Sequence, residues 1–186
     1  MGKIHEKLDP KLEEFIRSQH VFFVGTAPSS GAGHVNVSPK GLDSLRILGP
    51  SSVAYVDYPG SGVETIAHLR QNGRIVLMLC AFDGPPKILR LYGRGRVVEP
   101  VAPEFRELLS CFDVRLQPRS IIVVDLERIA DSCGYAVPRY EFKAERDQLA
   151  RWAESRGPDG LAVYQAERNS ESIDGLPGLP IAGEPA

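Results

Sequence analysis

Polar and apolar residues alternate along residues 34–40 of the chain, which read HVNVSPK. A repeat of two residues is typical of a β-strand with one buried face. Asn36, Ser38 and Lys40 then share one face, and Val35 and Val37 share the other, which we expect to be buried. The strand ends in a lysine, so it closes either in an ordinary turn with a solvated cation or in a site for an anion.

Similar patterns predict further strands. Residues 74–82 form a continuous apolar run, which indicates a strand buried on both faces, whereas residues 87–99 alternate. The predicted strands lie at residues 20–27, 34–40, 44–49, 52–58, 74–82, 87–99 and 120–129.

Four segments have helical signals. Asp9 and Pro10 suit the cap and first turn of a helix, and Gly73 suits the end of a helix that begins near Val63. A short helix is predicted near residues 103–112. An amphipathic helix is predicted at about 140–156, followed by an irregular tail rich in Gly and Pro.

The order of these elements predicts the fold class. Six to seven strands with few intervening helices favour an antiparallel sheet, because parallel strands need long crossovers. We therefore predict a mainly β (α+β) fold, a closed or partly closed barrel with peripheral helices. The chain has 186 residues, so we expect one domain over residues 1–186.

Composition limits the classes of function. The formal net charge is −2, which gives no basic footprint for nucleic acid. The three cysteines form no CxxC pair, so a reducing, cytoplasmic setting fits best. The N-terminus lacks the apolar core of a signal peptide, and no apolar run is long enough to span a membrane. The histidines show no metal-binding spacing.

A Gly-rich turn between strand and helix is a candidate anion site. The strand over residues 52–58 ends near Asp57, and Gly60 and Gly62 precede the helix that begins near Val63. Helix N-terminal amides favour an anion, and Thr65 adds a hydroxyl. The turn lacks the GxxxxGK[ST] pattern of a nucleotide P-loop. Together with Lys40 and Arg90, this turn suits a phosphate and a polar ring edge.

The segments SPKG (38–41), ETIAHLRQNGRIVL (64–77) and LYGRGRVVE (91–99) resemble the pyridoxamine 5'-phosphate oxidase-like family. The resemblance covers roughly residues 10–130 and implies an FMN-binding split β-barrel. It implies that the strand ending in Ser38, Pro39 and Lys40 lines the flavin, and that a helix start, here Val63, Glu64 and Thr65, lies at the phosphate.

Two features depart from the family pattern. Glu64 and Thr65 stand where true oxidases usually have a basic pair, and the chain ends without the basic segment that helps those oxidases hold substrate and flavin. Vitamin B6 oxidation is therefore not the expected activity.

Several positions allow two interpretations. Tyr55 and Tyr92 suit barrel packing or flavin stacking, and Arg90 suits a cross-strand ion pair or a ligand contact. In similar proteins the loop after the last strand lies near the flavin, so Ser132 and Cys133 belong either to the site or to a plain turn. The predicted cofactor-binding residues are Asn36, Ser38, Pro39, Lys40, Tyr55, Val63, Glu64, Thr65, Arg90, Ser132 and Cys133.

The resemblance implies an FMN-dependent oxidoreductase acting on a small molecule, with the chemistry supplied by the flavin. A flavin store or sensor without turnover is the alternative, and some relatives take heme or a deazaflavin instead. The family pairs as homodimers with the flavin at the interface. The apolar runs at residues 75–82 and 120–126 exceed what a small one-sided sheet can bury, which also favours a partner surface.

Overall fold

The computed structural model describes residues 2–114 and 116–180. The strands are β1 (Ile4–His5), β2 (Phe22–Thr26), β3 (Asn36–Lys40), β4 (Leu45–Gly49), β5 (Ser52–Asp57), β6 (Arg74–Cys80), β7 (Ile88–Val98) and β8 (Ser120–Ser132). The helices are α1 (Pro10–Arg17), α2 (Glu64–Asn72), α3 (Phe105–Leu109) and α4 (Gln148–Asn169). The predicted order of strands and helices is confirmed.

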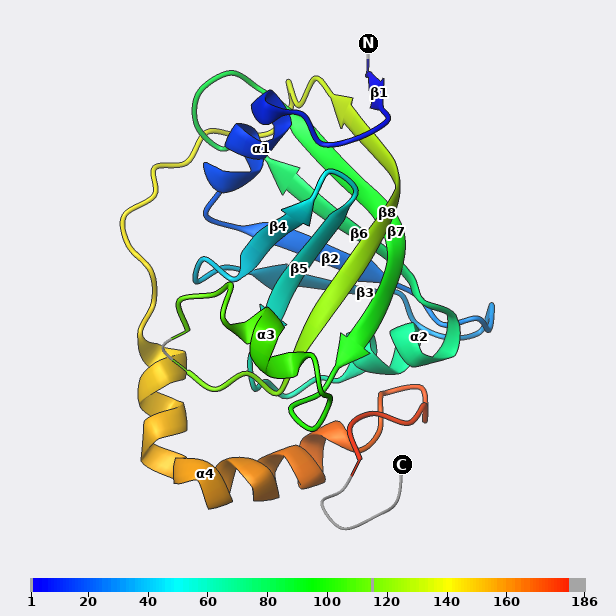
Figure 1. The fold of residues 1–186 in the computed structure, drawn as a ribbon, viewed down its shortest axis with the longest axis vertical. Helices are drawn as coiled ribbons and strands as arrows, with labels where there is room; N and C mark the ends of the chain where they lie inside the picture. The colour runs from blue at the N-terminus through cyan, green and yellow to red at the C-terminus, as the bar shows by residue number, and fades with distance from the viewer. Residues whose placement is uncertain (1, 115, 181–186) are drawn as a thin grey trace.

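The strands form one antiparallel sheet in the order β3-β2-β6-β7-β8-β5-β4, with the short β1 beside β8. The sheet curls into a half-barrel, with α1 near one end and α2 near the other (Figure 1). Although β3 and β5 are far apart in the strand order, Lys40 Nζ of β3 lies 2.7 Å from Asp57 Oδ1 of β5. The mainly β split-barrel fold predicted from the sequence is therefore confirmed.

The faces of β3 are the reverse of those expected. Asn36, Ser38 and Lys40 are partly buried, whereas the residues Val35 and Val37 are 73% and 64% exposed. The period of two was correct, but the pattern alone does not say which face turns inward. The polar face of β3 turns toward the barrel interior because Lys40 and Asn36 find polar partners there.

Two apolar clusters are found among the residues that the structure describes. The main cluster lies inside the curled sheet and includes Val24, Leu77, Leu91 and Ile122. The second lies outside β5 and β8, beneath α3, and it is made of Ala54, Val56, Val98, Phe105, Phe112, Ile121 and Val123.

The second cluster accounts for the apolar surplus of β8, because residues on both of its faces are buried within the same chain. A partner is not needed to cover this strand. In β6, by contrast, the inner residues are buried, while Val76 and Met78 on the other face are only partly buried within the single chain.

Local signals fix the first two helices. The Asp9 carboxylate accepts a hydrogen bond from the Leu12 amide at 2.8 Å, and Pro10 occupies the first turn of α1. Gly73 ends α2 with φ of 68°, a left-handed conformation that glycine adopts without steric cost. Both predicted boundaries are correct within two residues.

The C-terminal helix differs from its prediction. Residues 140–147 are not helical, and α4 runs from Gln148 to Asn169 with a break at Gly157, whose φ is 65°. Pro158 then begins a second helical segment, since proline is tolerated in a first turn. Residues 170–180 form a turn with an isolated bridge between Glu171 and Pro177, and the last part of the predicted irregular tail, residues 181–186, lies outside the described residues.

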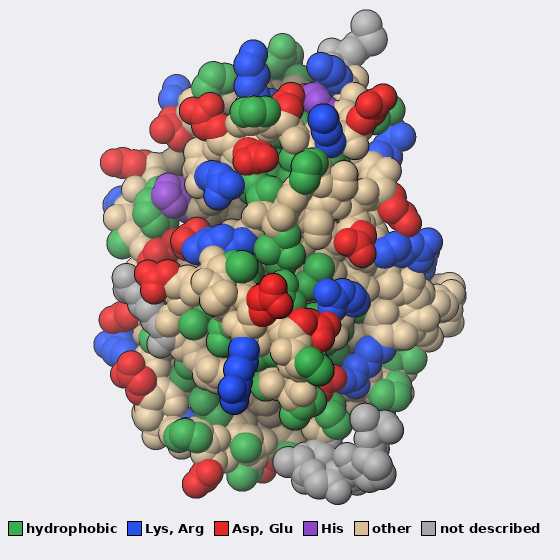
Figure 2. Space-filling view, in the orientation of Figure 1, with side chains coloured by type: hydrophobic (Ala, Val, Ile, Leu, Met, Phe, Trp, Pro, Cys, Tyr) green, Lys and Arg blue, Asp and Glu red, His purple; other side chains and the backbone are tan. Residues whose placement is uncertain are grey.

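None of the helices in the described ranges is both long and apolar enough to cross a bilayer. On the face seen in Figure 2, acidic and basic side chains are interspersed.

Candidate functional site

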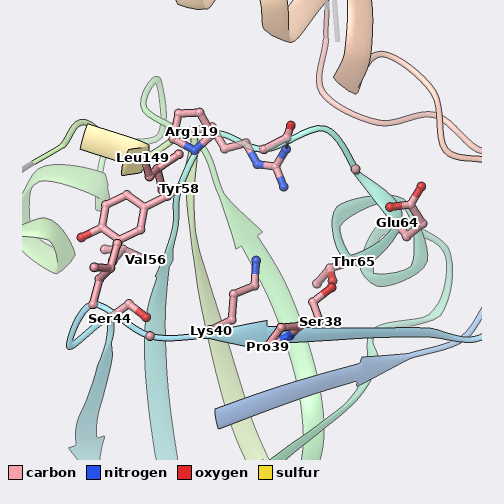
Figure 3. A pocket seen from close by; sticks show the side chains of 15 residues that line it. Ser38, Pro39, Lys40, Ser44, Val56, Tyr58, Glu64, Thr65, Arg119 and Leu149 are labelled. Atoms are coloured by element: carbon pink, nitrogen blue, oxygen red, sulfur yellow. Dashed lines mark hydrogen bonds between the residues drawn. The ribbon is translucent and has the colours of Figure 1, made fainter. Parts of the chain in front are cut away.

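A pocket of about 270 Å³ lies where β3, β5 and the start of α2 meet. Its walls come from the end of β3, the turn at residues 58–62 and the N-terminus of α2 (Figure 3). The lining residues are Ser38, Pro39, Lys40, Gly41, Leu42, Ser44, Val56, Tyr58, Pro59, Gly60, Gly62, Glu64, Thr65, Arg119 and Leu149. The Lys40 ammonium and the Arg119 guanidinium point into the pocket from opposite sides (Figure 3).

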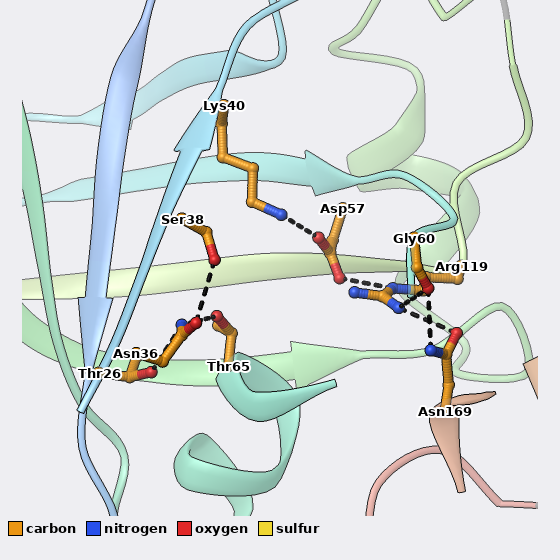
Figure 4. Close-up of polar contacts among 9 residues, drawn as sticks. All are labelled: Thr26, Asn36, Ser38, Lys40, Asp57, Gly60, Thr65, Arg119 and Asn169. Carbon is orange, nitrogen blue, oxygen red and sulfur yellow. Dashed lines mark hydrogen bonds and ion pairs between the residues drawn. The ribbon is translucent and has the colours of Figure 1, made fainter. Parts of the chain in front are cut away.

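A fully buried carboxylate, Asp57, joins these two cations. Its Oδ1 accepts a hydrogen bond from Lys40 Nζ at 2.7 Å, and its Oδ2 accepts one from Arg119 Nε at 2.8 Å (Figure 4). Arg119 Nη1 also donates to the side chain of Asn169 at 2.9 Å and to the carbonyl of Gly60 at 3.2 Å. We call Lys40, Asp57, Arg119 and Asn169 the Asp57 network.

The surroundings keep Asp57 ionised. Burial alone would raise the pKa of this carboxyl, but the charges and hydrogen bonds of Lys40 and Arg119 outweigh burial and lower the pKa below its ordinary value. One buried anion thus holds two cations at the pocket wall. Because Asp57 itself does not line the pocket, the cations face the hollow.

A second polar cluster orients the hydroxyls of the pocket. Asn36 Nδ2 donates to Thr65 Oγ1 at 3.0 Å and to Thr26 Oγ1 at 3.3 Å, and Asn36 Oδ1 accepts from Ser38 Oγ at 3.2 Å (Figure 4). Since Thr65 Oγ1 accepts this bond, its own proton remains available to a ligand. The buried ring of His68 lies behind the cluster, with Nδ1 3.0 Å from Thr26 Oγ1, and burial lowers its pKa.

The N-terminus of α2 has no side-chain cap. Val63 occupies the cap position but offers no side-chain hydrogen bond to the first amides of the helix. The carboxylate of Glu64 folds back over Gly62 and accepts a long hydrogen bond of 3.4 Å from the Ile173 amide. Open amides favour an anion at this position, but an incoming anion must also accommodate the charge of Glu64.

The structure separates the predicted site residues into three groups. Ser38, Pro39, Lys40, Glu64 and Thr65 line the pocket, and the predicted residue Asn36 lies directly behind them.

The second group lies in the core. Tyr55 is completely buried against Phe22, with ring centroids 5.5 Å apart, and Val63 packs in the same cluster. Of the two interpretations of Tyr55, packing is therefore the one observed, and neither side chain reaches the pocket.

The third group lies on the outer side of the sheet or just after its last strand, and it consists of Arg90, Ser132 and Cys133. Arg90 Nη1 donates to Ser132 Oγ at 3.1 Å, so its partner is a hydroxyl rather than the acid that one interpretation expected. Cys133 follows the end of β8 and is exposed. None of the three lines the pocket.

Sequence comparison relates this chain to a known family. The sequence model of the family described as pyridoxamine 5'-phosphate oxidase matches residues 8–133. The chain belongs to the pyridoxamine 5'-phosphate oxidase family. It is 40% identical over 201 residues to the pyridoxamine 5'-phosphate oxidase family protein ustO of Aspergillus flavus, covering 98% of this chain and 80% of that protein.

Two solved structures share the fold of this chain at low sequence identity. HupZ of Group A Streptococcus superposes with a TM-score of 0.54 and 19% identity, over 66% of this chain and 91% of that one. A putative pyridoxamine 5'-phosphate oxidase of Lactobacillus delbrueckii gives a TM-score of 0.53 and 17% identity, over 68% and 98%. Residues 134–186 lie outside the family match but are largely covered by the Aspergillus relative.

The residues of the pocket fit the phosphate end of a flavin, the group that the family resemblance implies. Two cations, the open amides of α2 and the Thr65 hydroxyl face one hollow. Ser44 Oγ is buried at its wall and has no hydrogen-bond partner among the described residues. A hollow of 270 Å³ is smaller than pockets that enclose a whole drug-sized ligand. It adjoins a second hollow of about 260 Å³, which shares Gly41 and Ser44.

Three members of the Asp57 network were not predicted from the sequence as ligand-site residues: Asp57, Arg119 and Asn169. Asp57 carried a signal, because an acid at the end of an apolar strand is rarely buried without a partner. Arg119 lies 62 positions from Asp57, and Asn169 lies another 50 positions on, so no local spacing connects them. Only the folded chain brings them together.

Proposed function

We propose that this chain is an FMN-binding oxidoreductase that acts on a small-molecule substrate. One observation carries the proposal. Lys40 and Arg119 face each other across a hollow at the start of α2, where the helix has no side-chain cap. Cations and helix amides at one point favour a phosphate monoester. Membership of the family supports a flavin as the molecule that bears this phosphate.

Each pocket residue has a definite part in this proposal. Lys40 and Arg119 supply positive charge, Thr65 donates its hydroxyl proton, and the α2 amides donate to phosphate oxygens. Asp57 and Asn36 do not touch the ligand but hold these groups in position. A bound flavin supplies the redox chemistry, so the protein need only bind, orient and exclude water.

Flavin titration tests the proposal. Apoprotein titrated with FMN, riboflavin and FAD should bind FMN most tightly, because the pocket offers contacts to one terminal phosphate. Stopped-flow mixing of the flavin-loaded protein with NADPH should then bleach the flavin absorption, which a store or sensor without turnover would not do. Tighter binding of FAD, or no binding of any flavin, would contradict the FMN assignment.

We also propose that the protein is a homodimer joined through the outer side of β3, β2, β6 and β7. Each flavin would extend from the pocket past Pro39, which lines the pocket and belongs to the outer side, to the interface. Two rows of paired residues cross the strands on this surface, as the strand register shows. The rows are Val37-Gly25-Val76-Tyr92 and Pro39-Phe23-Met78-Arg90. Val37, with 64% of its surface exposed, lies at the edge of this apolar surface. A two-fold pairing covers such a surface with a second copy of itself.

Sedimentation velocity at low micromolar concentration tests the dimer. The wild-type protein should sediment as a dimer, and Val37→Lys should shift it toward monomer, because the substitution places a charge within an apolar interface. Val163→Lys on α4 is the matched control, since Val163 is 58% exposed and lies outside the two rows. A wild-type monomer that retains bound flavin would refute both the dimer and the shared site.

A further inference from the structure

The C-terminal end of α4 reaches the wall of the pocket through the side chain of Asn169, which is completely buried and lies behind Arg119 and Gly60. Its Oδ1 accepts a hydrogen bond from Arg119 Nη1 at 2.9 Å, and its Nδ2 donates to the Gly60 carbonyl at 2.9 Å (Figure 4). The amide of Asn169 therefore joins a cation of the pocket to the Gly-rich turn that forms another wall. A buried amide with both ends engaged fixes the groups that it touches.

Residues 169–180, which we call the C-terminal strap, are docked on the same wall. The Leu179 amide donates to the Asn169 carbonyl at 2.7 Å, and the Leu179 side chain is buried in the main core cluster, which also contains Val63. The guanidinium of Arg70 donates to the Gly178 carbonyl. Helix α2 and the strap are thus packed together beside the start of that helix.

The far end of the strap is tied to the loop before β3. Asp174 accepts hydrogen bonds from the His34 amide at 2.7 Å and from the His34 ring at 2.6 Å. The Ile173 amide donates to Glu64 at the start of α2. The strap therefore contacts both elements that supply phosphate-facing groups, α2 and the segment leading into β3.

We propose that Asn169 is a positioning residue of the pocket, and that the C-terminal strap must be docked for the pocket to bind the phosphate of its ligand. The inference rests on the proposed function for the identity of the ligand, but not for the coupling between Asn169 and the pocket wall. Without Asn169, Arg119 loses one of its hydrogen bonds and the carbonyl of Gly60 loses a donor. Docking and ligand binding are then linked, so each stabilises the other.

Hydrogen exchange of the ligand-free, full-length protein tests the coupling. Asn169→Ala should raise the exchange of the Arg119 and Ala67 amides at least tenfold, because these amides donate to the carbonyls of Asp57 and Val63 in the pocket walls that Asn169 joins. Arg168→Ala is the matched control, because Arg168 is the exposed neighbour on the same helix, and it should change exchange there less than twofold. Unchanged exchange of these two amides in the Asn169 variant would overturn the proposal, even if no flavin binds.

Ligand titration tests the positioning of the cation. Asn169→Ala should raise the Kd for FMN at least tenfold and the Kd for riboflavin less than threefold, because Arg119 is placed to meet the phosphate. Equal losses for both ligands would mean that Asn169 is only structural. In the wild type, saturating FMN should slow exchange of residues 169–180, and bound FMN with no such protection would refute the linkage. Failure of every flavin to bind would contradict the proposed function and leave the exchange result to decide the coupling.

A second variant keeps the test decisive if Asn169→Ala does not fold. A Cβ at Gly178 would meet the Asn169 carbonyl and the side chain of Val63, so Gly178→Ala should undock the strap without removing a pocket residue. We expect Gly178→Ala, like Asn169→Ala, to lose more affinity for FMN than for riboflavin. Retention of wild-type FMN affinity in a variant whose residues 170–180 exchange freely would overturn the proposal.

Discussion

Lys40 and Arg90 are both strand cations in a polar setting, yet they lie on opposite sides of the sheet. Lys40 pairs with Phe22, which pairs with Leu79, which pairs with Leu89, the residue before Arg90. Because side chains alternate between faces, this offset of one residue places Lys40 inside the half-barrel and Arg90 outside. The comparison shows that two cations at nearly the same level of a sheet can face opposite sides and meet different partners.

Lys40 and Arg90 also differ in how much stability is lost when their partner is removed. Lys40 meets a carboxylate that is completely buried, whereas Arg90 meets only a hydroxyl. Loss of a partner from a buried ion pair leaves an uncompensated charge, but loss of a partly exposed hydrogen bond is easily replaced by water. We therefore expect substitutions on the inner side to have much larger effects.

The largest effect is expected for Asp57→Asn. This change removes the charge that compensates Lys40 and Arg119, and breaking a buried pair in this way should lower the free energy of unfolding by about 3–5 kcal/mol. Chemical denaturation measures the loss. Asp83→Asn is the control, because both side chains of the Asp83–Arg139 pair are exposed and the change should leave the free energy of unfolding almost unaltered. Equal losses in the two variants would contradict the role of Asp57.

Acid should reduce the difference between wild type and Asp57→Asn. The folded-state pKa of Asp57 is lowered from an ordinary value of 3.8, so its stabilisation is fully present above that value. The contribution is lost as the pH falls through the folded-state pKa. Denaturation curves between pH 7 and pH 2 should therefore converge for the two proteins in the acid range, and a constant gap would count against an ionised Asp57.

An intermediate effect is expected for Lys40→Ala. Loss of a charge-assisted contact should weaken FMN relative to riboflavin by about 1.5–3 kcal/mol, since only FMN carries the phosphate. Isothermal titration with both ligands measures the difference. Equal weakening of the two ligands would mean that Lys40 does not contact the phosphate.

The smallest effect is expected for Arg90→Ala. Its guanidinium lies on the outer side of the sheet and does not line the pocket, so the ratio of the FMN and riboflavin Kd values should change less than twofold. The same titration measures it. A loss of FMN affinity as large as that of Lys40→Ala would place Arg90 at the phosphate and remove the distinction between the two sides.

Much of the fold could be predicted from the sequence because its signals are local. Alternation located the strands, and Asp9, Pro10 and Gly73 marked helix ends. The direction in which β3 faces could not be predicted, because Val35 and Val37 look like core residues until the partners of Asn36 and Lys40 are known. The family resemblance located five residues of the pocket, all within residues 38–65.

The rest of the site depends on contacts between distant parts of the chain. Arg119 and Asn169 have no motif, and each acquires its role only through Asp57 and Gly60 in the folded protein. The second half of α4 was missed for a different reason. Gly157 and Pro158 do break the helix, but a break followed by proline can also begin a new helical segment.

The Asp57 network also bears on how fast the protein folds and unfolds. It joins residues separated by 17, 62 and 50 positions along the chain, and contacts between distant residues carry a large loop-closure cost. We therefore expect the network to form after the folding transition state. Interactions absent from that state slow unfolding without speeding folding. The stability lost in Asp57→Asn should thus appear as a faster unfolding rate, so the network chiefly sets how long each folded molecule survives.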